Sequence, residues 1–139
     1  PPPYSKDDIL VVQIKAGFYD SSPVTSRVAI ENSILKNRID LPVTTPKVGR
    51  QLEVTSDLNN KQNYKQEFVY LVQVTNEDGK VVSFSWLNGH LNPYQILNIG
   101  IIWQPMEAGL YKVETFVWKS LGFPLPLAKP VTSYYEVIP

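Results

Sequence analysis

From about residue 40 onward, apolar and polar residues alternate with a period of two, in runs separated by turn signals. This pattern predicts β-strands that each turn one face toward a core. With a short strand expected around residues 41–45, the runs give about seven strands in about 100 residues. The predicted inward-facing residues are Leu52, Val54, Ser56, Leu58, Phe68, Tyr70, Val72, Val74, Val82, Phe84, Trp86, Leu97, Ile99, Ile101, Trp103, Tyr111, Val113, Thr115, Val117, Val131, Ser133, Tyr135 and Val137.

Turn signals fix where several of these strands end. Asn76-Glu77-Asp78-Gly79 predicts a tight hairpin, because glycine supplies the positive φ that such a turn needs. Asn88-Gly89 and Asn92-Pro93 mark the next turn region. The run from Glu107 to Val113 fits a tyrosine corner, with Tyr111 at the start of the sixth strand. We therefore predict an all-β chain that folds as an immunoglobulin-like β-sandwich of about seven strands.

Composition excludes several classes of function. The 139 residues contain no cysteine, which rules out disulfides, thiol catalysis and thiolate metal sites. Thirteen basic residues balance thirteen acidic ones without a block of like charge, so neither nucleic acid nor an anionic membrane is an expected partner. No apolar stretch is long enough for membrane insertion. The chain opens at Pro1 without methionine, and we expect a processed mature form or an excised piece.

Residues that could support catalysis or bind a metal are few and scattered. His90 is the only histidine and lies in a predicted turn, so neither a metal site nor a Ser-His-Asp triad is expected. The carboxylate pairs Asp7-Asp8 and Glu77-Asp78 fit solvated turns better than a calcium loop. We therefore expect no enzymatic activity, no cofactor and no metal.

Several segments together carry a resemblance to a known family. They are Gly49-Arg50-Gln51-Leu52, Asp57-Leu58-Asn59-Asn60, Gln66 to Val74, Asp78 to Leu87, Leu91-Asn92-Pro93-Tyr94-Gln95, Trp103-Gln104-Pro105, Ala108-Gly109-Leu110-Tyr111 and Phe116 to Leu121. Residues 40–139 resemble an immunoglobulin-like domain that recurs in secreted and surface proteins of archaea. The resemblance implies a β-sandwich, an extracellular setting and a structural or adhesive role. Residues 121–130, more apolar than usual, and residues 1–39 depart from the family pattern.

The N-terminal extension, residues 1–39, carries its own apolar run. One face of this run is formed by Leu10, Val12, Ile14, Ala16 and Phe18. Such a run favours burial in a sheet, and three arrangements are open. The run could join the edge of its own sandwich, it could be lent to a neighbouring subunit whose sheet it completes, or it could be a flexible or inter-domain segment. Residues 22–39 fit neither the helical nor the strand period.

The positions of the tryptophans lead to two further predictions. Trp86 and Trp103 share the parity of Phe84 and Ile101, which predicts core positions rather than a glycan-binding platform. Trp118 has the opposite parity to Val117 and, with the apolar residues that follow it, predicts either loop packing or a contact surface. For that second contact we select Trp118, Phe123 and Leu125.

Together these observations predict a structural subunit of an archaeal extracellular filament or surface assembly. Its partners are copies of itself, joined by the strand Leu10, Val12, Ile14, Ala16 and Phe18. The alternative is a cell-surface module that binds a glycan or another surface protein.

Overall fold

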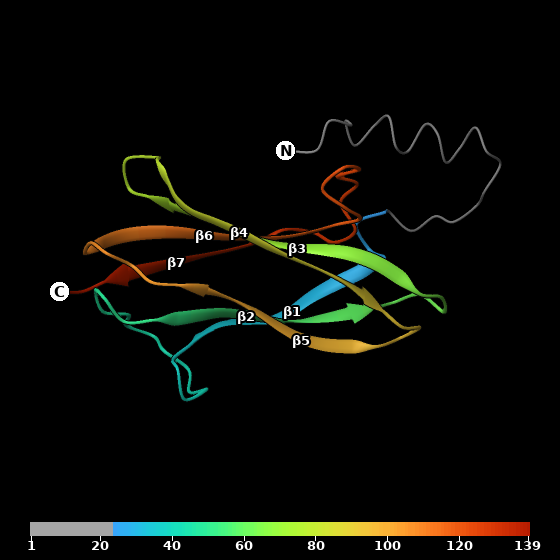
Figure 1. Cartoon of the computed structure of the whole chain (residues 1–139), viewed down its shortest axis with the longest axis horizontal. Helices are drawn as coiled ribbons and strands as arrows, with labels where there is room; N and C mark the ends of the chain where they lie inside the picture. The colour runs from blue at the N-terminus through green and yellow to red at the C-terminus, as the bar shows by residue number, and fades with distance from the viewer. Residues whose placement is uncertain (1–23) are drawn as a thin grey trace.

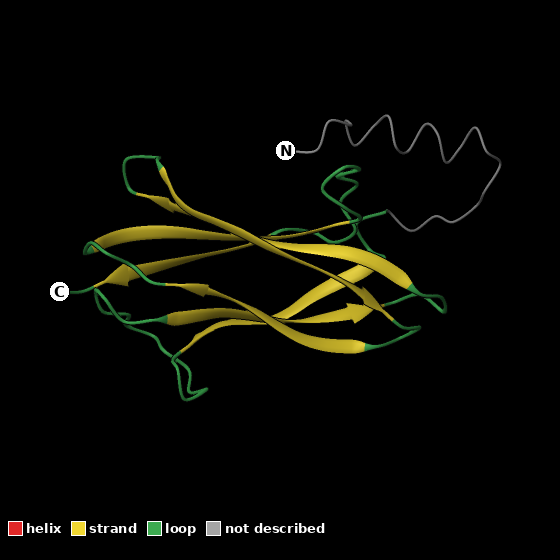
Figure 2. Cartoon of the chain, viewed as in Figure 1, coloured by secondary structure: helices red, strands yellow, loops and turns green. Residues whose placement is uncertain are grey.

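The computed structural model describes residues 24–139, which form two antiparallel β-sheets packed face to face (Figure 1). No helix occurs in this part of the chain, so no described helix could cross a membrane (Figure 2). One sheet has the order β1-β2-β5 and the other β4-β3-β6-β7. The strands are β1 (Val28–Lys36), β2 (Leu52–Asn60), β3 (Gln66–Asn76), β4 (Val81–Leu91), β5 (Ile96–Trp103), β6 (Gly109–Trp118) and β7 (Val131–Val137).

The core lies between the sheets, and most of the predicted inward faces are confirmed. Phe68, Tyr70, Val72 and Val74 of β3 are buried there. So are alternate residues of β2, β5 and β6, as the two-residue repeat of a strand requires. The core residues of these three strands are Leu52, Val54, Leu58, Ile101, Trp103, Tyr111, Val113 and Val117.

The first strand of the sandwich comes from the segment that fitted neither period. β1 pairs antiparallel with β2, and the register shifts between Glu31 and Ile34. Asn32 has a φ of 51°, so a β-bulge interrupts the strand. The bulge places two residues between Ile30 and Ser33 where a regular strand has one. This extra residue hides the strand period in the sequence.

The short strand expected around residues 41–45 is not formed. In its place, residues 37–51 connect β1 to β2 and make two isolated bridges, one from Pro42 to Lys36 and one from Lys47 to Ile138. Because β1 belongs to the sandwich, the described domain reaches further toward the N-terminus than the predicted boundary at residue 40. The prediction missed this because Pro42 and Pro46 interrupt the alternation while the bulge masks β1.

The turn predictions at Asn76–Gly79, at Asn92-Pro93 and at the tyrosine corner are confirmed. Gly79 has a φ of 81°, and the side chain of Asn76 accepts hydrogen bonds from the backbone of Asp78 and Lys80 at 3.0 and 2.9 Å. These contacts close the hairpin between β3 and β4. The tyrosine corner is also present, because the Tyr111 hydroxyl donates to the Glu107 carbonyl at 2.7 Å.

The turn predicted at Asn88-Gly89 is wrong. Both residues continue β4, where Gly89 pairs with Phe68 of β3. The glycine is needed there for space, since a Cβ atom would lie 2.9 Å from Cζ of the buried Phe68 ring. His90 consequently sits on a strand with an exposed side chain, and not in a turn.

Candidate contact surfaces

The outer face of the four-stranded sheet is apolar at its centre. Val69 and Leu71 of β3 alternate with the core residues, so they point away from the core, yet both are fully buried. Leu71 is paired with Trp86 of β4 on one side and with Phe116 of β6 on the other. Neighbouring side chains on this outer face therefore cover β3, as a second hydrophobic layer outside the sandwich core.

Four aromatic rings flank these two aliphatic residues. On β4 the ring centroids of Phe84 and Trp86 are 5.8 Å apart, and on β6 those of Phe116 and Trp118 are 5.9 Å apart. Each pair is tilted by 48°. We call the surface made by Phe84, Trp86, Phe116 and Trp118 around Val69 and Leu71 the aromatic face.

The aromatic face corrects part of the sequence prediction. Phe84 and Trp86 were expected in the core, but their side chains are 44% and 45% exposed. Val82 is likewise exposed. β4 is an edge strand, and alternation alone cannot indicate which of its two faces is covered. Trp103 is buried as predicted and packs edge-on against Tyr111.

The three residues selected as a second contact occupy different positions. Trp118 belongs to the aromatic face and is half-buried. Phe123 lies in the loop between β6 and β7, 39% exposed, with Nζ of Lys119 5.2 Å from its ring centroid. Leu125 packs against the core and therefore helps to hold the domain itself. The candidate strand Leu10, Val12, Ile14, Ala16 and Phe18 lies outside the described residues.

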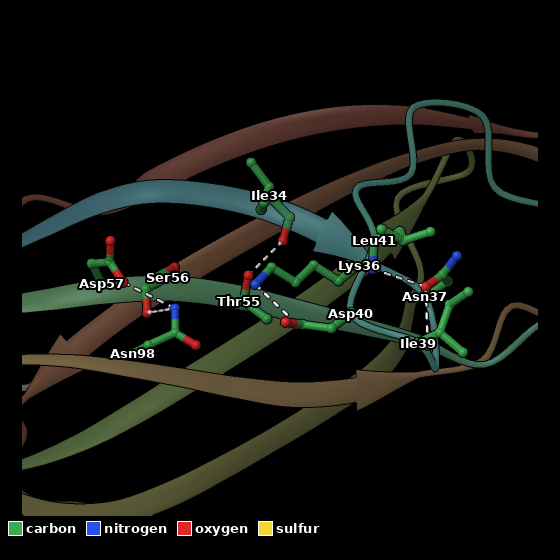
Figure 3. A network of polar contacts seen from close by, with 10 residues as sticks. All are labelled: Ile34, Lys36, Asn37, Ile39, Asp40, Leu41, Thr55, Ser56, Asp57 and Asn98. Atoms are coloured by element: carbon green, nitrogen blue, oxygen red, sulfur yellow. Dashed lines mark hydrogen bonds and ion pairs between the residues drawn. The ribbon is translucent and has the colours of Figure 1, made fainter.

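The outer face of the three-stranded sheet has a polar centre. The Asp57 carboxylate accepts one hydrogen bond from the side chain of Asn32 and one from that of Asn98, both at 2.9 Å. These two bonds lower the pKa of Asp57 from its ordinary value, because they stabilise the charged form. Figure 3 shows Asn98 reaching Asp57 and Ser56 across the strands. The two outer faces of the sandwich thus differ in character.

The same close-up shows how β1 ends in an ordered turn. The Asn37 side chain accepts hydrogen bonds from the backbone of Ile39 and Leu41, both at 3.0 Å (Figure 3). Lys36 pairs with Asp40, whose φ of 65° is the left-handed conformation that aspartate tolerates. A hollow of about 360 Å³ beside this turn is lined by Arg38, Lys47 and Arg50 among others. It is open and mixed in character, and no group aimed into it indicates a ligand.

The interior contains a small polar cluster. The Tyr70 hydroxyl lies 3.0 Å from the Ser56 hydroxyl and donates to the Val54 carbonyl at 3.3 Å. Ser56 in turn lies 2.8 Å from the Ser33 hydroxyl on β1. Burial raises the pKa of Tyr70 to about 12, because the charged form would be poorly solvated there. These hydroxyls bond one another, so the cluster connects the two sheets.

Within residues 24–139, no three side chains among His, Asp and Glu lie close enough together to hold a metal ion. The aromatic face carries exposed rings on a regular sheet whose central residues Val69 and Leu71 are fully buried.

Several solved structures have a fold similar to that of this chain. No protein-family model matches the sequence, and no characterised protein matches it either. Among solved structures, the C-terminal domain of wzt is similar with a TM-score of 0.66 and 11% identity, covering 82% of this chain and 75% of that one. The CARDB domain of the PF1109 protein from Pyrococcus furiosus, solved with di-metal ions, has a TM-score of 0.55 and 15% identity, covering 80% and 92%.

A β-glucuronidase from Bacteroides uniformis is also similar, with a TM-score of 0.62 and 13% identity. The match covers 78% of this chain but 14% of the enzyme, so this chain corresponds to a small part of that protein. At such low identities the likeness concerns the fold and carries no activity across. With seven strands in two antiparallel sheets and a tyrosine corner, the described chain is an immunoglobulin-like β-sandwich.

Proposed function

We propose that this chain is a structural subunit of an archaeal extracellular filament or surface assembly, in which copies of the chain join by donating an N-terminal strand. It performs no catalysis in this role. An immunoglobulin-like domain fits a surface or binding module, and the family resemblance of residues 40–139 supports the archaeal and extracellular setting.

The observation that carries the proposal is that the described residues form a two-sheet sandwich of their own. Within the described part of the chain, seven strands between residues 28 and 137 make up the two sheets. The run that contains Leu10, Val12, Ile14, Ala16 and Phe18 therefore precedes a domain whose sheets are paired. An apolar strand of this kind gains most by completing a sheet elsewhere, and a neighbouring copy offers one.

The free energy of burying the strand is large enough to hold two subunits together. Burying an apolar side chain of this size contributes roughly 1.5–3 kcal/mol, so five of them contribute about 8–15 kcal/mol before backbone hydrogen bonds. Association costs about 4–15 kcal/mol. A donated strand therefore holds when its backbone pairs well. Because such a head-to-tail contact does not close on itself, it produces a filament.

The aromatic face supplies a second contact between subunits. Exposed apolar surface supported by a regular sheet is typical of protein–protein interfaces, and tryptophan and tyrosine dominate their energetics. Trp86 and Trp118 lie on either side of the buried Leu71 and Val69, so a partner that covers one ring pair also approaches the other.

A surface module that binds a glycan is the second candidate. It is favoured by the exposed rings of Phe84 and Trp86. However, the two rings of each pair are tilted by 48°, whereas sugar-binding platforms use coplanar rings. A glycan-binding module predicts a monomer whose tryptophan fluorescence changes on addition of a sugar, while the assembly predicts polymers.

Electron microscopy and light scattering of the purified full chain test the proposal. Replacing Val12 and Ile14 by aspartate is expected to abolish polymers, because both charges enter the apolar side of the strand. The matched control places aspartate at Gln13 and Lys15, on the other side of the same run, and is expected to leave polymers intact. A native chain that remains monomeric at high concentration, or equal effects of the two pairs, contradicts strand donation.

A further inference from the structure

The side of the sandwich formed by β1 and β7 is held together at both ends. At one end, the Val28 amide donates to the Leu127 carbonyl at 2.9 Å. At the other end, the Val48 amide donates to Ile138 at 3.0 Å and the Ile138 amide donates to Pro46 at 2.9 Å. On the opposite side of the sandwich the edge strands β4 and β5 lie beside each other. The two sides are therefore built differently.

Between its two closed ends, the β1/β7 side is incompletely covered. Ile30 and Ser33 of β1 and Ser133 and Tyr135 of β7 belong to inward-facing positions, yet they are only half-buried. At the strand ends, Val28, Leu35 and Val137 are buried, whereas Val131 is half-buried like the middle of β7. Two of the four half-buried residues are serines, whose small side chains leave room for larger ones. This is the pattern expected where one further strand could cover the inner face.

β7 is the more receptive of the two edges. It pairs with β6 from Val131 to Val137 without a register shift, and its sequence contains neither lysine nor proline. Native proteins usually protect an exposed edge with such residues or with a bulge. β1 has this protection, because the bulge at Asn32 disturbs its ladder. β7 has none over these residues.

We infer that the edge of β7 from Val131 to Val137 is the acceptor for residues Leu10–Phe18 of a neighbouring copy. This inference rests on the proposed function and names the surface on which it operates. The alternation of the segment fits the site: its five apolar residues turn toward the half-buried inner face. Gln13 and Lys15 then turn outward, beside the exposed Thr132 and Tyr134.

Engineered disulfides test this pairing directly, because the chain has no cysteine of its own. One chain carries Gln13→Cys or Lys15→Cys, and a second carries Thr132→Cys or Tyr134→Cys. The four combinations sample the neighbouring registers, and in the proposed pairing all four side chains would lie on the outer face, away from the core. A disulfide forms only when the two Cα atoms come within about 7 Å. Ile102→Cys, exposed on β5, is the matched control for the acceptor.

We expect a covalent dimer between the two different chains when the acceptor cysteine is in β7, and no such dimer with Ile102→Cys. A chain with both cysteines is expected to give a ladder of covalent polymers. Cross-links confined within single chains overturn the inference and show that the segment docks on its own sandwich. Polymers of the uncross-linked chain without any disulfide to β7 overturn the acceptor while the proposed function stands. Absence of polymers altogether removes the proposed function itself.

Discussion

The ring of Phe68 packs directly over Gly89 on the neighbouring strand, and it occupies the place that a side chain at residue 89 would need. A Cβ atom there would lie 2.9 Å from Cζ and 3.1 Å from Cε2 of the ring. Phe68 is 2% exposed, so its ring has little freedom to move aside. A bulky core ring and a glycine on an edge strand thus form one packing unit.

Gly89→Ala is expected to destabilise the domain by about 1–3 kcal/mol, because overpacking a closed core forces side chains from their preferred rotamers. Thermal unfolding measures this as a lower melting temperature. Gly122→Ala is the matched control, since no atom lies within 4 Å of its added Cβ. In a Phe68→Leu background the alanine should cost less. Equal costs in the two backgrounds would show that the ring is not the obstacle.

Tyr111→Phe is expected to cost about 0.5–1.5 kcal/mol, because it removes the 2.7 Å hydrogen bond to Glu107 and leaves that carbonyl without its partner. The ring remains in place against Trp103, with centroids 5.3 Å apart. Urea unfolding measures the change. Tyr134→Phe removes the same hydroxyl from a side chain that is 75% exposed and should have no effect. Similar losses in both variants would argue against a stabilising corner.

Stability is expected to fall at alkaline pH. The folded-state pKa of Tyr70 is about 12, above its ordinary value of 10.0, so the folded protein binds this proton more tightly than the unfolded chain. The protonated Tyr70 hydroxyl therefore contributes fully to the free energy of unfolding below about pH 10. This contribution is lost as the pH rises to about 12, a change of about 2–3 kcal/mol. Burial also raises the pKa of Tyr111 and Tyr135, which adds in the same direction.

Urea unfolding over this pH range provides the measurement. Tyr70→Phe should lower stability at neutral pH, because the Ser56 hydroxyl loses a partner, and should flatten the decline above about pH 10. An unchanged slope in this variant would assign the alkaline decline to other groups.

The aromatic face predicts an effect on association that is separate from stability. Phe84→Lys places a charge among the rings. Position 84 suits this test because residue 84 pairs with Gln73 across the strands, and not with the buried Leu71. We expect weaker lateral association of subunits, measured by light scattering as a function of concentration, with little change in melting temperature. Ile102→Lys introduces the same charge on the other sheet, where the side chain is 57% exposed. Equal effects of the two lysines would contradict a role of this face.

Local chemistry explains which predictions from the sequence are confirmed. Asp78-Gly79 specifies its turn through one positive φ, and Tyr111 specifies its corner through one hydrogen bond, so each can be recognised from a few residues. The regular alternation of β6 likewise identifies its buried side.

Features that depend on distant residues could not be predicted in this way. Asn88-Gly89 has the composition of a turn, yet Phe68, some twenty residues earlier in the chain, requires the glycine within a strand. β1 was missed because the extra residue at Asn32 breaks the period. Trp86 points outward because the other sheet covers the opposite face of this edge strand. The alternation of residues is the same whichever face is covered, so it could not predict this orientation.

The difference between the two outer faces limits how thick an assembly can grow. If two copies meet through their rings, both exteriors of the pair present the cluster of Asn32, Asp57 and Asn98, in which both side-chain amides already donate to the carboxylate. Such a pair leaves no ring surface for a third layer. In the proposed filament, stacking through the aromatic face would therefore stop at two layers, while growth along the donated strands would not be limited in this way.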